Sequence, residues 1–171
     1  RLTPAVQKKV LFISGLLAGI LPIAHAHSFI ALMILAGIVC IFHWRHWKIL
    51  TWFVLPAAIL SSVLYTTFIY GGIENASFIT LLVGWTSHGG IWGWVEMWVI
   101  LWGVMLPTAW RAMYLLWQRI SLPARGVFIG AWALFVAANV WLFQPIRWDN
   151  TKLFFWAYLF FCMLAAMLIA D

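Results

Sequence analysis

Long apolar runs alternate with short polar stretches along the whole chain. Six of these runs predict helices, and they cover residues 10–23, 29–42, 49–70, 91–110, 126–143 and 153–170. A membrane-spanning helix needs about 20 predominantly apolar residues. The pattern therefore predicts an all-α fold, a polytopic membrane helix bundle of about five to six transmembrane helices. A further run at residues 77–85 is too short to span a membrane and predicts a short interfacial or re-entrant helix.

The composition excludes an ordinary soluble domain. The chain is 66% hydrophobic and 8% charged, whereas soluble domains carry about a quarter charged residues. We therefore expect one transmembrane domain over residues 1–171. The net charge of +6 requires no nucleic acid, because Lys and Arg at helix ends set membrane orientation. The expected partners are membrane lipid and either other membrane subunits or the remainder of the chain.

The first residue is Arg1 rather than Met, and no stretch has the pattern of a signal peptide. We therefore expect a C-terminal or internal piece of a longer protein. Two cysteines, Cys40 and Cys162, lie inside apolar runs. Their position predicts a packing role rather than a disulfide or a metal site.

Positive charges are unevenly distributed over the connections between the predicted helices. Three alternate connections contain eight of the ten cations: Arg1, Lys8, Lys9, Arg45, Lys48, Arg111, Arg119 and Arg125. Cytoplasmic connections carry the excess of Lys and Arg, so this side and the N-terminus are predicted to be cytoplasmic. The connections at residues 25–28, 71–90 and 144–152 then lie on the outer side.

Residues 144–152 form the densest polar stretch of the chain. Here Arg147 and Lys152 could bind a phosphate, Arg by a two-pronged contact and Lys as a point charge, with Asp149 orienting Arg147. The other interpretation is structural. It consists of an Arg147–Asp149 salt bridge within the turn, a Lys152 side chain that anchors the last helix, and an N-cap formed by Asp149 and Asn150. The two roles can coexist.

Other polar residues fall on the same predicted side. The rings of His25 and His27 are expected to point to opposite faces of an extended turn, so they would need His88 or Glu74 to complete a divalent metal site. The alternative role is that of hydrogen-bonded turn histidines. Glu96 either pairs with a neighbouring helix as a buried carboxyl or lines a water-accessible cavity, because ionisable groups rarely face lipid.

Spacings of four residues mark several helix faces. Trp94, Trp98 and Trp102 form an aromatic stripe that either packs inside the bundle or faces a lipid tail or a pigment. Three glycine pairs with the same spacing allow neighbouring backbones to approach closely; they are Gly15/Gly19, Gly89/Gly93 and Gly126/Gly130.

Two short motifs resemble the later transmembrane region of polytopic GT-C-type glycosyltransferases. One is a proline followed by His-x-His-Ser at the head of a helix, in residues 21–29, and the other is Gln-Pro-x-x-x-Asp-Asn-x-Lys between two helices, in residues 144–152. The resemblance implies an enzyme of the outer face that uses a polyprenyl-phosphate sugar as its donor. It implies a phosphate site formed by Arg147, Lys152, His25 and His27, with Asp149 and Asn150 shaping the turn and the Trp stripe bordering the prenyl tail.

Enzymes of this family usually carry a catalytic acid in the first outer loop, and the first outer turn here has none. Glu74 is the fallback candidate for an acid or base, and the enzyme activity of this chain stays open. The alternative function is that of a non-catalytic subunit of a larger respiratory or photosynthetic assembly. A transporter fits less well, because only Glu96 and Asn139 are plausible polar groups within the predicted spans.

Overall fold

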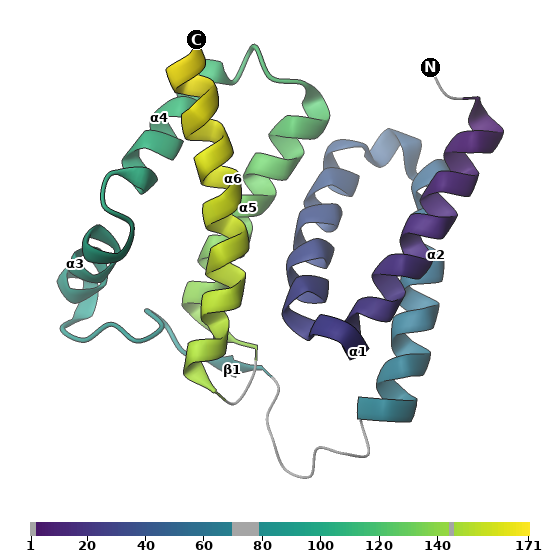
Figure 1. Ribbon diagram of the computed structural model, residues 1–171, viewed down its shortest axis with the longest axis horizontal. Coiled ribbons are helices and arrows are strands. Elements are labelled where there is room, and N and C mark those ends of the chain that lie inside the picture. Colours follow the sequence, from purple (N-terminus) through teal and green to yellow (C-terminus); the bar gives the residue numbers. More distant parts are fainter. Residues whose placement is uncertain (1–2, 70–78, 144–145) are drawn as a thin grey trace. The chain divides into compact units, whose positions relative to one another are not determined.

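The computed structural model describes residues 3–69, 79–143 and 146–171 (Figure 1). They form, in order, α1 (Pro4–Phe42), η1 (Trp44–His46), α2 (Trp47–Leu64), η2 (Tyr65–Ile69), β1 (Thr80–Leu81), α3 (Gly90–Trp102), α4 (Met105–Leu116), α5 (Leu122–Val140), β2 (Trp141–Leu142), η4 (Arg147–Asn150) and α6 (Thr151–Ala170).

The predicted all-α membrane fold is confirmed. Within the described residues, four helices are long and apolar enough to cross a membrane, or five if the bent pair α3 and α4 counts as one span. The chain divides into two compact units, Arg1–Ala76 and Ser77–Asp171. Each unit is described by itself.

The first unit is built from α1 and α2, and α1 itself is broken at His25. His25 has φ of −162° and ψ of 90°, which are not helical values, and the chain reverses there (Figure 1). The Nδ1 atom of His25 accepts a hydrogen bond from the backbone N–H of Ser28 at 3.2 Å. A side chain that accepts from the N–H three residues later is the geometry of an N-cap. His25 therefore starts the second half of α1, at the turn that the sequence predicts.

Gly15 and Gly19 allow α1 to approach α2 closely. A Cβ atom at Gly15 would overlap the carbonyl oxygen of Phe53 and lie 2.7 Å from Cγ of Pro56, and one at Gly19 would lie 2.8 Å from Cβ of Leu60. Real side chains do not make contacts this short, so the two helices can pack in this way only around glycine. The close approach predicted for this pair is confirmed.

The substitution Gly15→Ala is expected to lower the free energy of unfolding by about 1–3 kcal/mol, because the added methyl group overpacks the α1–α2 contact. Gly37 on the same helix has no atom within 4 Å of its Cβ position. Gly37→Ala should therefore be neutral or stabilising by up to about 1 kcal/mol. Equilibrium unfolding of the purified protein in detergent compares the two variants, and equal effects would contradict the packing argument.

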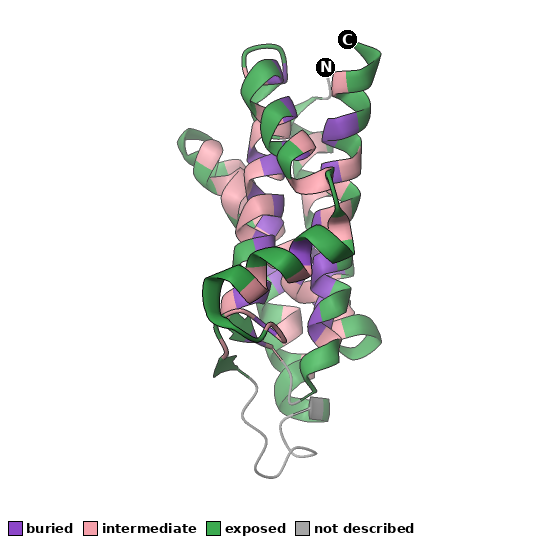
Figure 2. Cartoon of the chain, turned by 90° about the vertical axis from the view of Figure 1, so that its left-hand side faces the viewer, coloured by how far each residue is buried: buried purple, intermediate pink, exposed green. Residues whose placement is uncertain are grey.

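The second unit has its core between α4, α5 and α6. Buried residues recur on one face of α6, at Leu153, Ala157, Phe161 and Leu164. Figure 2 shows buried residues as separate patches along the helices, with exposed residues between them. Large apolar side chains such as that of Ile169 remain exposed on the opposite faces, as expected for helices that lipid surrounds.

The start of α5 differs from the prediction. Ser121 is its N-cap, and the hydroxyl accepts a hydrogen bond from the N–H of Ala124 at 3.5 Å. Pro123 lies in the first turn, where a missing N–H costs nothing. Pro123 therefore belongs to this helix, and α5 starts before the predicted residue 126.

The single helix predicted over residues 91–110 is wrong. The chain breaks at Gly103, whose φ of +54° and ψ of −126° glycine adopts readily. The two helices on either side, α3 and α4, meet at an angle of 85°. Arg111, which was expected in the following turn, consequently lies within α4.

The short helix predicted over residues 77–85 is also wrong for its described part, residues 79–85. Strand β1 forms there and pairs antiparallel with β2, with Thr80 opposite Leu142 and Leu81 opposite Trp141. A short apolar run has no periodicity that separates a strand from a helix. The pairing holds the start of the second unit against the end of α5.

Candidate functional site

The buried side chain of Asn150 organises the polar stretch that follows β2. It is fully buried, and its Nδ2 donates hydrogen bonds to the carbonyl oxygens of Ala138 at 2.9 Å and Trp141 at 2.7 Å. Its Oδ1 accepts from the N–H of Phe143 at 3.3 Å. Asn150 occupies the N-cap position of α6, but its side chain makes no capping bond. It ties the end of α5 to the start of α6 instead.

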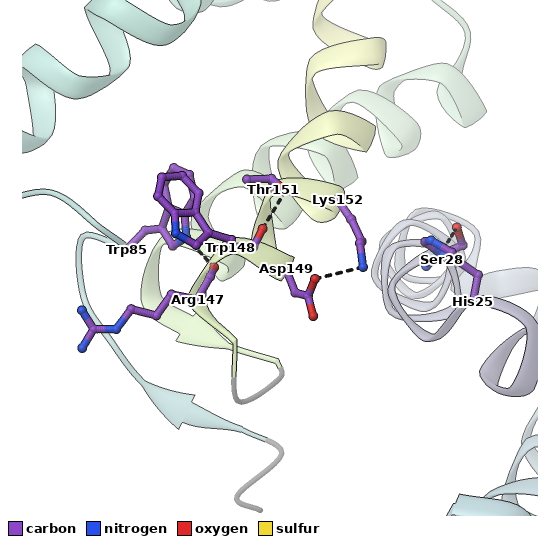
Figure 3. Close-up of polar contacts among 8 residues, drawn as sticks. All are labelled: His25, Ser28, Trp85, Arg147, Trp148, Asp149, Thr151 and Lys152. Atoms are coloured by element: carbon purple, nitrogen blue, oxygen red, sulfur yellow. Dashed lines mark hydrogen bonds and ion pairs between the residues drawn. The ribbon is translucent and has the colours of Figure 1, made fainter.

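The charged side chains of this stretch do not converge (Figure 3). Nζ of Lys152 lies 2.9 Å from Oδ1 of Asp149, whereas Arg147 extends away from this pair in Figure 3. No described residue forms an ion pair with the guanidinium of Arg147. The predicted Arg147–Asp149 salt bridge is therefore wrong. The charge of Lys152 is locally neutralised, whereas no carboxylate in the described part of the chain neutralises that of Arg147.

Trp85 joins the turn before α3 to the polar stretch that contains Arg147. Its Nε1 donates a hydrogen bond to the carbonyl oxygen of Arg147 at 2.8 Å (Figure 3), and its ring centroid lies 5.6 Å from that of Trp148 and 4.9 Å from that of Phe154. Trp85 is buried and has φ of 55°, a left-handed conformation that is strained for a bulky residue. Such strain persists only where the surroundings hold it in place, and it concentrates at functional sites.

The two predicted phosphate-binding histidines belong to the first unit. Their rings lie 5.8 Å apart with an interplanar angle of 59°, so the expectation that His25 and His27 point to opposite faces is wrong. Nδ1 of His25 is engaged by Ser28, whose hydroxyl oxygen lies 2.9 Å away, and His27 is buried. Arg147 and Lys152 belong to the second unit, so no single unit holds all four residues.

Metal ligands are not gathered in the part of the chain that the structure describes: no three His, Cys, Asp or Glu side chains there lie close enough together to hold an ion. His88 lies in the second unit, apart in the chain from His25 and His27. Glu74, the fallback acid, lies outside the described residues.

The tryptophan stripe packs inside the second unit around Asn139. Nε1 of Trp94 and Nε1 of Trp98 both donate to Oδ1 of Asn139, at 2.7 Å and 3.0 Å. The amide nitrogen of Asn139 donates to the carbonyl oxygen of Phe135 at 2.9 Å. Further along the stripe, the Trp102 ring centroid lies 5.1 Å from that of Phe135. The stripe therefore joins α3 to α5, as its packing interpretation expects.

Replacing Asn139 with Leu should destabilise the second unit, because it leaves two indole N–H groups without an acceptor. An unsatisfied buried donor costs about 1–3 kcal/mol, so we expect a loss of about 2–4 kcal/mol in the free energy of unfolding. Gln118→Leu is the matched amide-to-apolar control at an exposed position. Unfolding followed by tryptophan fluorescence measures both, and a neutral Asn139→Leu would contradict the role given to this amide.

An apolar groove opens beside the stripe. It has a volume of about 640 Å³, and Asn139 together with six apolar side chains forms most of its lining: Val83, Ile91, Trp94, Phe135, Val136 and Val140. The backbone N–H of Gly84, which also lines the groove, donates to the carbonyl oxygen of Asn139 at 2.7 Å. The turn that contains Gly84 and Trp85 therefore lines the groove and also forms the hydrogen bond to Arg147.

A second pocket is lined in part by residues of the same turn. We name it the indole pocket; it measures about 370 Å³ and is lined by Trp85, Thr86, Ser87, His88, Gly93, Glu96, Met97, Ile100, Leu101 and Trp148. Glu96 is exposed there, and no described residue bonds to its carboxyl group. The buried, paired Glu96 is therefore the wrong alternative, and Glu96 lines a cavity. The sequence gives little sign of this pocket, because its walls come together only through the turn and η4.

Comparison with known protein families, with curated proteins and with solved structures finds no match to this chain. Its function must therefore be argued from the chemistry of the site.

Proposed function

We propose that this chain is the later transmembrane region of a GT-C-type glycosyltransferase that binds a polyprenyl-phosphate sugar on the outer face of the membrane. The observation that carries the proposal is the guanidinium of Arg147, with which no described carboxylate forms an ion pair, at the same end of the second unit as the apolar groove. The carbonyl of Arg147 is bonded to the indole of Trp85, and the adjacent residue Gly84 lines the groove. A lipid phosphate needs a cation for its phosphate group and an apolar groove for its hydrocarbon chain.

The groove suits the hydrocarbon part of such a ligand. Pockets for small ligands are mostly apolar with a few placed polar groups, and here the indole of Trp94 and the side chains of Val136 and Val140 supply the apolar wall. The proposal gives Trp94 the role of bordering the prenyl tail. Trp98 is buried in the core and supports Trp94 through their shared acceptor, Asn139.

Arg147 is the principal phosphate ligand in this proposal. Its planar guanidinium can hold two phosphate oxygens at once, and no carboxylate of the described residues occupies it. Lys152 contributes less, because Asp149 already neutralises its charge. In the first unit, Nδ1 of His25 accepts from Ser28, which leaves its Nε2 available. Glu74 lies outside the described residues, and the proposal assigns it no role.

Replacing Arg147 with Gln is expected to weaken the binding of polyprenyl phosphate by about tenfold or more, because a hydrogen bond to a charged group is worth about 1.5–3 kcal/mol. Lys152→Gln is the matched cation-to-amide control and should weaken binding by less than about threefold, as expected for an exposed, paired cation. Titration of polyprenyl phosphate into the protein in lipid nanodiscs measures both affinities. Unchanged donor affinity and unchanged sugar transfer in Arg147→Gln would sink the proposal.

The proposed orientation puts residues 144–152 outside and the turn between α4 and α5 inside. Thr151 begins α6 and Ser121 caps α5, and both are exposed. In intact cells a membrane-impermeant thiol reagent should therefore label Thr151→Cys and label Ser121→Cys only after permeabilisation. The unsubstituted protein, which contains Cys40 and Cys162, supplies the background. The reverse labelling pattern would refute the orientation.

A further inference from the structure

We infer that the indole pocket is a binding site for a monosaccharide ring. The inference deepens the proposed function, on which it rests for the identity of the molecule that delivers the sugar, but the pocket itself is argued from its own walls. Trp85 and Trp148 provide aromatic surface, and Glu96 and His88 provide polar groups of its lining.

The aromatic part of the pocket is fixed by its surroundings. Trp85 is held by the hydrogen bond to the carbonyl of Arg147 and by its contact with Phe154. Trp148 is exposed and meets Trp85 edge to face at an interplanar angle of 85°. The face of an indole carries negative charge density, and the C–H groups of a sugar ring, which are slightly positive, pack favourably against it. Two indoles at right angles offer such a ring both a face and an edge.

The polar part of the pocket suits hydroxyl groups. The side chains of Glu96 and His88 form no hydrogen bond or ion pair with other described residues. The hydroxyl of Thr86 donates to Sδ of Met97 at 3.7 Å and that of Ser87 donates to the carbonyl of Gly84 at 2.8 Å, so their oxygens remain available as acceptors. A sugar hydroxyl can donate to the Glu96 carboxylate, and such charge-assisted bonds are the stronger ones.

The charges of the pocket exclude a phosphate as its occupant. Among the described residues, its lining contains the carboxylate of Glu96 and no Lys or Arg, so an anion would be repelled. Arg147, which forms no ion pair with any residue that the structure describes, lies outside the lining, although its neighbour Trp148 belongs to it. In one donor molecule, the phosphate would therefore bind to Arg147 and the sugar to the neighbouring indole pocket.

The backbone around the indole pocket has a close contact and positive φ values that few residue types tolerate. A Cβ atom at Gly93 would overlap the carbonyl oxygen of His88, so the turn packs directly onto the backbone of α3. Gly89 and Trp85 both have positive φ values, of 85° and 55°. Glu96 is the one acidic residue of α3, and an ionisable group in an apolar membrane segment indicates a functional site.

The test uses the protein in lipid nanodiscs free of sugar detergents, with a panel of methyl glycosides of glucose, galactose, mannose, N-acetylglucosamine and arabinose as probes. Saturation-transfer NMR should show transfer to the ring C–H protons of at least one glycoside, and Glu96→Gln should weaken its binding by about tenfold. Trp148→Leu, at an exposed position, should abolish the transfer. Asp171→Asn is the matched carboxylate-to-amide control and should bind as the unsubstituted protein does.

Binding of sugar-free polyprenyl phosphate separates this inference from the proposed function. If the lipid phosphate binds but no glycoside does, or if Glu96→Gln binds the glycoside unchanged, the sugar pocket is overturned and the proposed donor site stands. If a glycoside binds in a Glu96-dependent way and the lipid phosphate does not bind, the pocket stands and the proposed donor is wrong.

Discussion

One side-chain oxygen, Oδ1 of Asn139, accepts hydrogen bonds from two indoles within an apolar bundle, and the arrangement of the second unit depends on it. Trp94 and Trp98 reach across to it from α3, so this short helix is located by directional bonds and by aromatic rings. Where water is scarce, a polar group must find its partner within the protein. The carbonyl of Asn139 also accepts from Gly84, so one residue positions both α3 and the turn before it.

The side-chain amide of Asn150 likewise positions the backbone at the start of α6. Its three bonds to backbone groups join α5, β2 and the polar stretch. Because buried amides and the strained Trp85 hold the frame, the charged groups Arg147 and Glu96 are not needed for its internal bonds. They remain at the surface, where a ligand can use them. In the proposed site the buried amides would support these exposed charges, an arrangement that precise sites generally use.

The apolar runs and their spacing predicted the helices, the turn at His25 and the close packing at Gly15, because these depend on local sequence. The break at Gly103 was missed, since an isolated glycine inside an apolar run is compatible with a continuous helix. Asp149 was expected to pair with Arg147, which is two residues away. In the helical turn of η4 and α6, side chains three residues apart lie together, whereas those two residues apart do not. Lys152 therefore meets Asp149. The two pockets depend on tertiary contacts of the turn at Gly84 and Trp85, which no local pattern contains.

The right-angled junction at Gly103 also bears on the surrounding bilayer. At 1.5 Å per residue, the 13 residues of α3 extend only about 20 Å, whereas the hydrocarbon layer is about 30 Å thick. A helix of this length is too short to cross that layer by itself. Among the described residues, α3 can therefore belong to a membrane span only together with α4, in a span that turns through a right angle.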